Sequence, residues 1–369
     1  MCIGNKIGFK FESDVNVFKP MYGTFVIELS EDVENEKLEV LGKTIEKEEI
    51  EINDIKLNLD ELIKLWEEPL EKVFPTKAKE INKTCENIVS DKKCTIVATS
   101  KFAKPRVFIP VFPGTNCEYD SSKAFEDAGA VADVEIFKNL KANDIEDSID
   151  TFAKAIEQAQ IIMIPGGFSA GDEPDGSGKF IASVFRNPKL KELIHKHLYE
   201  KDGLMLGICN GFQALVKLGL LPYGDIIDMT DEMPTLTFND IARHQSKMVR
   251  TKVVSKLSPW FNKVELGQEF IVPISHGEGK FVASEKVLKT LSDNGQIATQ
   301  YVDLSGNATY DIDYNPNGSV LAIEGITSKD GRILGKMGHA ERCYTGVTKN
   351  VPGDYDIKIF ESGVDYFRN

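Results

Sequence analysis

The sequence predicts an α/β protein: a mainly parallel sheet with helices on both faces, preceded by a small N-terminal α+β segment. Short continuous apolar runs, typical of strands buried on both faces, occur at residues 106–111, 161–165 and 204–208. Helical text and short loops separate these runs. A repeated strand–helix–strand order implies right-handed crossovers and parallel pairing.

The remaining elements of this part follow the same alternation. Residues 131–137 and 333–337 read as further strands. Residues 144–159 and 212–218 read as helices, and Gly219 ends the second one. Functional groups of parallel sheets collect at the carboxyl ends of the strands, so we expect the site there.

The N-terminal segment, residues 1–75, reads differently. Residues 23–29 and 49–53 are strand-like, and a helical pattern runs over 58–73 with apolar residues on one face. Asn58 is the expected N-cap, with Glu61 in the capping-box position. Nothing in this segment resembles a catalytic motif.

Three domain-level segments result: 1–75, a linker at 76–104, and a larger domain at 105–369. The linker text is polar, rich in Lys and Thr, and contains one predicted strand at 94–98. The lysines of this stretch are interpreted as solvated surface charges rather than a binding patch.

Composition excludes several classes of protein. The chain has 369 residues, 41% of them hydrophobic, and a formal net charge of −14. This charge argues against coating nucleic acid or an anionic membrane. No signal-peptide-like or membrane-spanning run is visible, so we expect a soluble cytoplasmic protein. The six cysteines are scattered without a CxxC pair, which predicts free thiols and no metal site.

One cysteine stands in a context typical of a nucleophile. Residues 207–211 read GICNG, after a buried strand and before a helix. This is the nucleophile-elbow pattern with Cys209 in place of serine. A sulfur at a helix N-terminus is favoured as the thiolate, and the amide of Asn210 points where an oxyanion would develop.

A second strand ends in residues 165–172, PGGFSAGD. Paired glycines let a backbone N–H approach a ligand closely, so Gly167 or Phe168 is a candidate second oxyanion donor.

A cysteine nucleophile needs a base that a third group orients. We interpret His195 and His197 as surface residues, and His244 has no evident partner. His276 and His339 remain, each with a glutamate two residues on. Residues i and i+2 of an extended segment share a face, so either glutamate could orient its histidine, and the residues alone do not choose.

Residues 165–172, 207–211, 274–279 (ISHGEG) and 338–342 (GHAER), in that order along the chain, resemble the class I glutamine amidotransferases. More closely, residues 106 to the end resemble the glutaminase domain of the phosphoribosylformylglycinamidine synthase family, to which the stretch 112–118 (FPGTNCE) is particular. The resemblance implies a flavodoxin-like fold and glutamine hydrolysis to glutamate and ammonia in purine biosynthesis.

The resemblance also implies roles for individual residues. It makes Cys209 the nucleophile, His339 the base and Glu341 its orienting acid. Residues Ser275, His276 and Gly277 would line the glutamine pocket, and Gln213 would contact the glutamine as well. The family's usual text is PHPER, whereas this chain has GHAER, and the His-x-Glu spacing is kept.

Residues 18–28 and 65–75 resemble the end of the synthetase region in the large, single-chain form of that enzyme. The resemblance therefore implies a synthetase partner, fused or separate, that uses ATP and Mg²⁺ and receives the ammonia. No phosphate-cradling glycine loop occurs in the N-terminal segment, so we expect no cofactor in this chain.

Two other readings are weighed against the glutaminase. A DJ-1/PfpI-like cysteine hydrolase shares the elbow but typically lacks the late His-x-Glu, which this chain has. A non-catalytic docking subunit would be expected to have lost at least one of the three triad residues.

Overall fold

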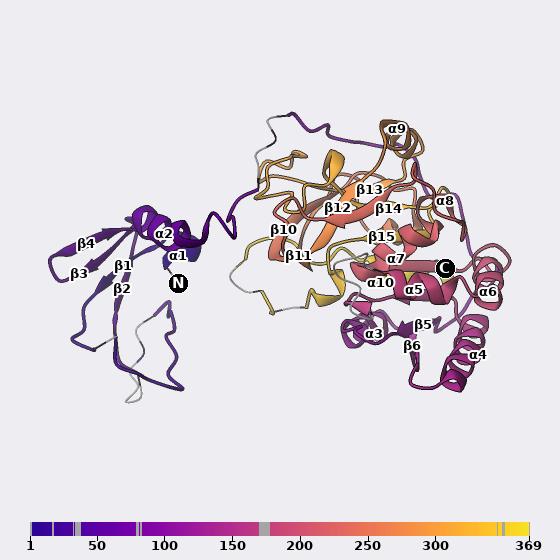
Figure 1. The fold of residues 1–369 in the computed structure, drawn as a ribbon, viewed down its shortest axis with the longest axis horizontal. Coiled ribbons are helices and arrows are strands. Elements are labelled where there is room, and N and C mark those ends of the chain that lie inside the picture. Colours follow the sequence, from indigo (N-terminus) through magenta and orange to yellow (C-terminus); the bar gives the residue numbers. More distant parts are fainter. Residues whose placement is uncertain are drawn as a thin grey trace. The chain divides into compact units, whose positions relative to one another are not determined.

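The computed structural model describes residues 2–16, 18–31, 33, 38–78, 81, 83–169, 178–344, 346–348 and 351–368. The chain forms two compact units, Met1–Lys77 and Ala78–Asn369 (Figure 1). Among the described residues, no helix is long and apolar enough to cross a membrane.

The first unit is a small sheet with helices. Its sheet has the order β2-β1-β3-β4. The elements are α1 (Cys2–Asn5), β1 (Gly8–Phe11), β2 (Gly42–Ile45), β3 (Glu49–Ile52), β4 (Ile55–Asn58), α2 (Leu59–Glu67) and the 3₁₀-helix η1 (Glu68–Leu70). Asn58 caps α2 as predicted, because its side chain accepts a hydrogen bond from the amide of Glu61 (3.2 Å).

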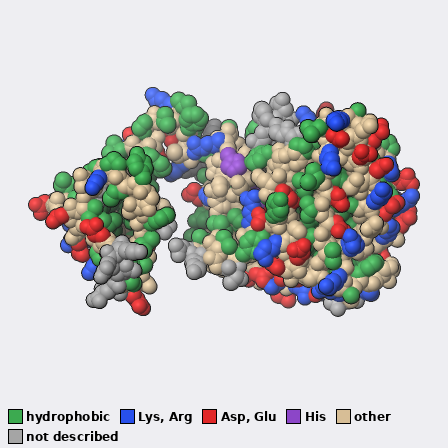
Figure 2. All heavy atoms as spheres, turned by 90° about the horizontal axis from the view of Figure 1, so that it is seen from below, with side chains coloured by type: hydrophobic (Ala, Val, Ile, Leu, Met, Phe, Trp, Pro, Cys, Tyr) green, Lys and Arg blue, Asp and Glu red, His purple; other side chains and the backbone are tan. Residues whose placement is uncertain are grey.

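The predicted strand at 23–29 is wrong. Residues 24–29 form no strand, and Phe25 and Val26 are 86% and 62% exposed. An apolar run becomes a strand only when a neighbouring strand takes up its backbone groups, and no strand of the described residues does so here. The space-filling view shows apolar side chains on the surface of this unit (Figure 2).

The second unit is built on a sheet that has nine strands within the described residues, in the order β11-β10-β13-β14-β15-β8-β7-β5-β6. One half is parallel: β6 (Val131–Ile136), β5 (Arg106–Val111), β7 (Ile161–Ile164), β8 (Leu204–Ile208) and β15 (Ile333–Lys336). The other half is antiparallel: β14 (Ile323–Thr327), β13 (Ile297–Tyr301), β10 (Gln245–Val253) and β11 (Glu269–His276).

The predicted α/β class is confirmed, while the antiparallel half was not foreseen. A separate two-stranded sheet joins β9 (Thr235–Phe238) and β12 (Glu278–Val282). The helices are α3 (Glu118–Asp127), α4 (Ala142–Gln158), α5 (Lys179–Phe185), α6 (Pro188–Tyr199), α7 (Asn210–Leu218), α8 (Leu220–Tyr223), α9 (Glu285–Asp293), α10 (Ile359–Arg368) and the 3₁₀-helices η3 (Pro259–Phe261), η4 (Val320–Ala322) and η5 (Ala340–Arg342).

Helices cover both faces of the parallel half. α3 contacts β5, β6 and α10, whereas α4 packs on α6, and α5 on α7. The strand order requires this, because β5 to β6 and β6 to β7 run in opposite directions along the sheet, so right-handed crossovers place α3 and α4 on opposite faces. The strands β7 and β8 between these layers are buried along their whole length.

The segment before β5 lies along the second unit. Ile88 and Ala98 are buried in its core, and the amides of Ser90 and Cys94 donate to the carbonyls of Val254 and Lys256. The predicted strand at 94–98 is wrong, because only a single bridge forms, between Lys93 and Lys256. On the face drawn in Figure 2, acidic and basic side chains are interspersed over this unit.

Candidate active site

Cys209 lies in the turn between β8 and α7 and is 4% exposed. Its backbone has φ 52° and ψ −108°. Residues other than glycine rarely adopt this conformation, and it stores strain. The glycines on either side make the turn feasible. A methyl group on Gly211 would lie 2.0 Å from the carbonyl oxygen of Ile164, and one on Gly207 would lie 2.5 Å from Leu215. The predicted elbow is therefore present, with glycine where strand and helix touch.

His339 and Glu341 follow β15. Nδ1 of His339 lies 2.6 Å from Oε1 of Glu341, and both residues are 1% exposed. Burial lowers the pKa of His339, but the charges of Glu341 and Cys209 outweigh it and hold that pKa well above its ordinary value. The buried pair thus favours the imidazolium form.

Sheet register brings the nucleophile and the base together. Along the parallel strands, Ile164 pairs with Gly207 and Ile208 pairs with Lys336, so β7, β8 and β15 end side by side. A methyl group built on Gly166 would lie 2.8 Å from Cε1 of His339 and 3.4 Å from Cβ of Cys209. The carboxyl edge of the sheet therefore gathers these side chains around one point, as the parallel topology requires.

The structure distinguishes the two candidate bases. Glu341 contacts His339, whereas both ring nitrogens of His276 are buried without a hydrogen-bond partner among the described residues. Burial, together with the nearby His339 and His244, lowers the pKa of His276 to about 3. His276 is therefore neutral at physiological pH and is not oriented by a carboxylate.

The residues 275–277 lie beside the nucleophile. Sγ of Cys209 is 3.8 Å from the carbonyl oxygen of Ser275, whose hydroxyl is 3.0 Å from Nε2 of His244. Asn239 fixes this loop, because its side chain donates to the carbonyl of His276 (2.8 Å) and its amide donates to that of Gly277 (2.9 Å). Neither Asn239 nor His244 was singled out from the sequence as part of the site.

The candidate oxyanion donors differ in whether their backbone N–H already donates to another group of the protein. The amide of Phe168 donates to the carbonyl of Gly114 (2.9 Å) and is therefore occupied. Gly167 has φ 146°, and a methyl group there would lie 2.7 Å from that same carbonyl oxygen. Asn210 begins α7, so its amide is one of those that a helix leaves free. Residues 170–172 of the glycine motif lie outside the described residues.

Gln213 is 4% exposed and connects the elbow to the loop at 275–279. Its side-chain oxygen accepts from Nδ2 of Asn210 (3.0 Å), and its Nε2 donates to the carbonyl of Glu278. Oδ1 of Asn210 in turn accepts from the amide of Ser169 (3.3 Å). Both polar groups of Gln213 are used within the protein, so it supports the walls of the site.

Cys117 is a site residue that sequence reasoning missed. It is fully buried, its Sγ lies 3.8 Å from Nδ1 of His339, and Nη2 of Arg342 donates to it (2.8 Å). The available signal was its place in the stretch 112–118, which the resemblance marks, but a scattered cysteine carries no signal by itself.

Cys117, His339 and Glu341 offer donor atoms within 4.8 Å of one another, a ligand set that zinc accepts. The surrounding contacts favour a hydrogen-bonded network instead. Glu341 is engaged by the imidazole, and the guanidinium of Arg342 would repel a cation at the sulfur.

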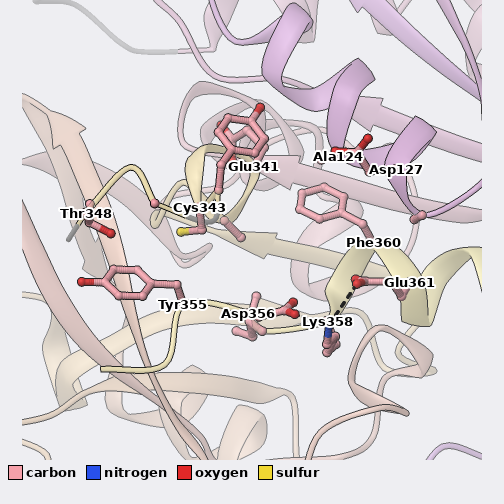
Figure 3. Close-up of a pocket in the computed structure, with 15 residues that line it drawn as sticks. Ala124, Asp127, Glu341, Cys343, Thr348, Tyr355, Asp356, Lys358, Phe360 and Glu361 are labelled. Carbon is pink, nitrogen blue, oxygen red and sulfur yellow. Dashed lines mark hydrogen bonds and ion pairs between the residues drawn. The ribbon is translucent and has the colours of Figure 1, made fainter. Parts of the chain in front are cut away.

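A cavity of about 560 Å³ lies beside Glu341, between α3, η5, α10 and residues 346–348 and 355–358 (Figure 3). Lys358, in its wall, is 3.3 Å from Glu361. Oε1 of Glu341 binds the histidine, while its Oε2 has no partner within the described part of the chain. Glu341 therefore contacts the candidate base and also lines this cavity.

The expectation for the two helical histidines is half wrong. His195 is exposed, but His197 is 1% exposed, with Nε2 3.3 Å from the carbonyl oxygen of Leu204. Burial lowers the pKa of His197 to about 4. It fills the space between α6 and β8, so its role is structural.

The fold, elbow and His–Glu pair define a cysteine-dependent amidotransferase class. Residues 104–367 match the family model for the CobB/CobQ-like glutamine amidotransferase domain. The chain belongs to this family.

Among its relatives is the phosphoribosylformylglycinamidine synthase subunit PurQ of Methanococcus maripaludis strain C5, 32% identical over 71% of this chain and 98% of that protein. The protein of the same name from Salinibacter ruber is 32% identical over 70% and 94% of the two chains. One similar solved structure is described as "Structure of PurLQS from Thermotoga maritima". It is 27% identical with a TM-score of 0.52, covering 71% of this chain and 99% of that one.

Proposed function

We propose that this chain hydrolyses L-glutamine to glutamate and ammonia and supplies that ammonia for formylglycinamidine ribonucleotide synthesis in purine biosynthesis. The observation that best supports this proposal is the buried His339–Glu341 pair (2.6 Å) beside Cys209, which lies in a strained turn. This constellation is a nucleophile, a base and an orienting acid, the requirement for cysteine acyl transfer. The PurQ names of the relatives support the pathway.

The chemistry follows from the site. The thiolate of Cys209 attacks the carboxamide carbon of glutamine, and the amides of Gly167 and Asn210 bind the oxyanion. His339, held as imidazolium by Glu341, gives its proton to the departing ammonia. Water, deprotonated by the same imidazole, then hydrolyses the γ-glutamyl thioester and releases glutamate.

Glutamine binding is assigned to the loop facing Cys209. Ser275 and Gly277 offer backbone groups there, and neutral His276 offers two ring nitrogens that have no partner among the described residues. Gln213 acts by holding the carbonyl of Glu278 in this loop. These assignments rest on proximity to the nucleophile.

The partner is a synthetase that uses ATP and Mg²⁺, fused or separate, and the first unit is the end of such a region in a large single-chain form. The support for a partner is that the relatives are named as subunits of a synthase and that a similar solved structure is described as PurLQS. The support for the synthetase end is the sequence of residues 18–28 and 65–75.

The test is glutamate release from glutamine by the purified chain, beside Cys209→Ala and His339→Ala. We expect both substitutions to lower kcat at least about 10³-fold, as nucleophile and base are each required. Adding a synthetase with ATP, Mg²⁺ and formylglycinamide ribonucleotide should stimulate the rate. Activity indifferent to Cys209 would refute the glutaminase, and activity without stimulation would refute the purine assignment.

A further inference from the structure

A fully buried ion pair lies beside Gly338, the residue before the proposed base. Nζ of Lys336, the last residue of β15, is 3.0 Å from Oε1 of Glu324 in β14, and both side chains are 0% exposed. Oε2 of Glu324 accepts from the hydroxyl of Thr299. The other residues of the two strands are apolar, glycine or, at the end of β14, threonine, so the pair is a charged insertion in the core.

The stability of the fold does not explain why a buried ion pair is present here. Removing two charges from water costs several kcal/mol for each, and apolar side chains of similar size often stabilise a fold as well or better. In some proteins a buried charged or polar group is retained because it fixes a geometry that apolar contacts leave loose. The question is therefore what this pair holds.

It holds both polar groups of Gly338, the residue before the base. The carboxylate of Glu324 accepts from the amide of Gly338 (2.7 Å), and the ammonium of Lys336 donates to its carbonyl oxygen (2.9 Å). A methyl group on Gly338 would lie 2.9 Å from Oε1 of Glu324 and 2.7 Å from Val272, so glycine allows the close approach.

Glycine is also the residue with the greatest backbone freedom, so the geometry at Gly338 depends on the contacts that restrain it. The neighbouring amides are bound too: that of Met337 to the carbonyl of Glu324 (3.1 Å), and that of His339 to the carbonyl of Pro273 (2.9 Å). The backbone carbonyl of Lys336 accepts from the amide of Cys209 (2.9 Å). One residue thus contacts the backbone of the nucleophile and the backbone that leads to the base.

We propose that Lys336 and Glu324 are positioning residues for catalysis: their buried ion pair restrains the peptide units around Gly338 and so directs the imidazole of His339 toward Cys209 and Glu341. The inference rests on the proposed glutaminase function for its kinetic test. It assigns that restraint to two charges and two hydrogen bonds.

The kinetic test is the double variant Lys336→Met, Glu324→Gln, which removes both charges and keeps side-chain size. We expect a folded protein whose kcat for glutamine hydrolysis falls at least tenfold while KM changes less than threefold, because the loop proposed to bind glutamine is unchanged. The matched control is Arg332→Met, Asp202→Asn, a largely buried pair (3.3 Å) at the start of β15, the other end of the strand. The control should keep kcat within threefold of the wild-type value. A folded double variant that keeps kcat within threefold overturns the proposal.

If the double variant does not fold, two single variants decide. Gly338→Ala and Gly338→Pro both add a Cβ against Val272 and Glu324, but only proline removes the N–H that Glu324 accepts. We expect proline to lower kcat at least fivefold more than alanine. Equal losses from the two substitutions overturn the proposal.

A readout independent of activity separates this inference from the proposed function. The proton between Nδ1 of His339 and Glu341 should give a low-field NMR signal in ¹⁵N-histidine-labelled protein, identified by its loss in His339→Gln. We expect this signal to move or broaden in the double variant and in Gly338→Pro, and to stay in the control. A wild-type chain without glutaminase activity refutes the function alone, whereas an unchanged signal in both variants refutes the positioning role.

Discussion

At the scale of single residues, the site depends on one hydrogen bond between two buried groups. Removing a histidine from water disfavours its charged form, yet Glu341 lies 2.6 Å away with the same degree of burial. Coulomb attraction at this distance is strong where water is excluded, so it outweighs the loss of hydration. The raised pKa of His339 follows from that contact and from the charge of Cys209.

Glu341→Gln should therefore change the pH dependence as well as the rate. Glutamine keeps an oxygen for Nδ1 but removes the charge, so the pKa of His339 falls toward the value that burial alone sets. Protonated His339 is then lost at lower pH, and the alkaline limb of the kcat/KM profile moves to lower pH. We expect kcat near neutrality to fall roughly 10²- to 10⁴-fold.

The check is a pH–rate profile of glutamate release for both proteins. His276→Gln serves as the control, because the pKa of His276 is about 3 and it does not titrate in the range measured. Its profile should keep the wild-type limbs whatever happens to KM. An unshifted alkaline limb in Glu341→Gln would show that Glu341 does not set the protonation of His339.

At the scale of elements, the strand–turn–helix unit β8–Cys209–α7 stores the strain of the site. A non-glycine residue at φ 52° and ψ −108° costs on the order of 1–3 kcal/mol and persists only where the surroundings enforce it. The packing of α7 against β7 through Gly211 is one such constraint, because no side chain separates helix and strand. The elbow is thus a property of three packed elements.

Gly211→Ala should disturb both packing and catalysis. Its methyl group would lie 2.0 Å from the backbone oxygen of Ile164, and backbone cannot rotate away as a side chain can. We expect a loss of about 1–3 kcal/mol in the free energy of unfolding, typical of overpacking. Because α7 must move and carries the amide of Asn210, kcat should fall at least tenfold.

Denaturant unfolding and steady-state kinetics measure the two effects. Gly267→Ala is the matched control, since its φ of 85° makes alanine costly while nothing lies within 4 Å of the added methyl group. That variant should lose stability and keep kcat. If Gly211→Ala keeps kcat while losing the same stability, α7 does not position the oxyanion donor.

At the scale of the whole molecule, the two units differ in how much apolar surface they bury. The hydrophobic clusters of the described residues lie in residues 78–369, and they include Ile88 and Ala98 from the segment that was expected to be a linker. In the first unit Leu59 is fully buried, whereas Trp66 is 71% exposed. A unit with so small a core is expected to be marginal on its own.

Two truncated chains test where the larger unit begins. A chain of residues 78–369 should keep the free energy of unfolding of the larger unit and its glutaminase activity. A chain that starts at residue 105 loses buried Ile88 and Ala98 and the hydrogen bond from the amide of Ile88 to Gln300 (2.9 Å), so we expect it to be less stable by about 3 kcal/mol or more. Equal stability of the two chains would make residues 78–104 a linker, as the sequence indicated.

Much of the fold was predictable because local signals were strong. The buried strands at 106–111 and 204–208 read as continuous apolar runs, and the helices between them follow a regular period. The antiparallel strands and the segment at 83–98 were not predicted, because their pairing depends on residues far away in the chain. Residues 23–29 show the converse, a strand-like pattern that no neighbouring strand completes.

The sequence by itself determined the elbow around Cys209, the proposed nucleophile, since glycines on both sides of a cysteine after a buried strand are a local geometric signal. The residues alone did not separate His339 from His276. The resemblance pointed to His339, and the tertiary structure supplied the physical distinction, because the identical His-x-Glu spacing leads to a 2.6 Å contact in one case and to none in the other. It alone brought Cys117, Lys336 and Glu324 to the base, from three separate elements. Local patterns fix backbone conformation, whereas contacts between distant side chains follow from the register of the sheet.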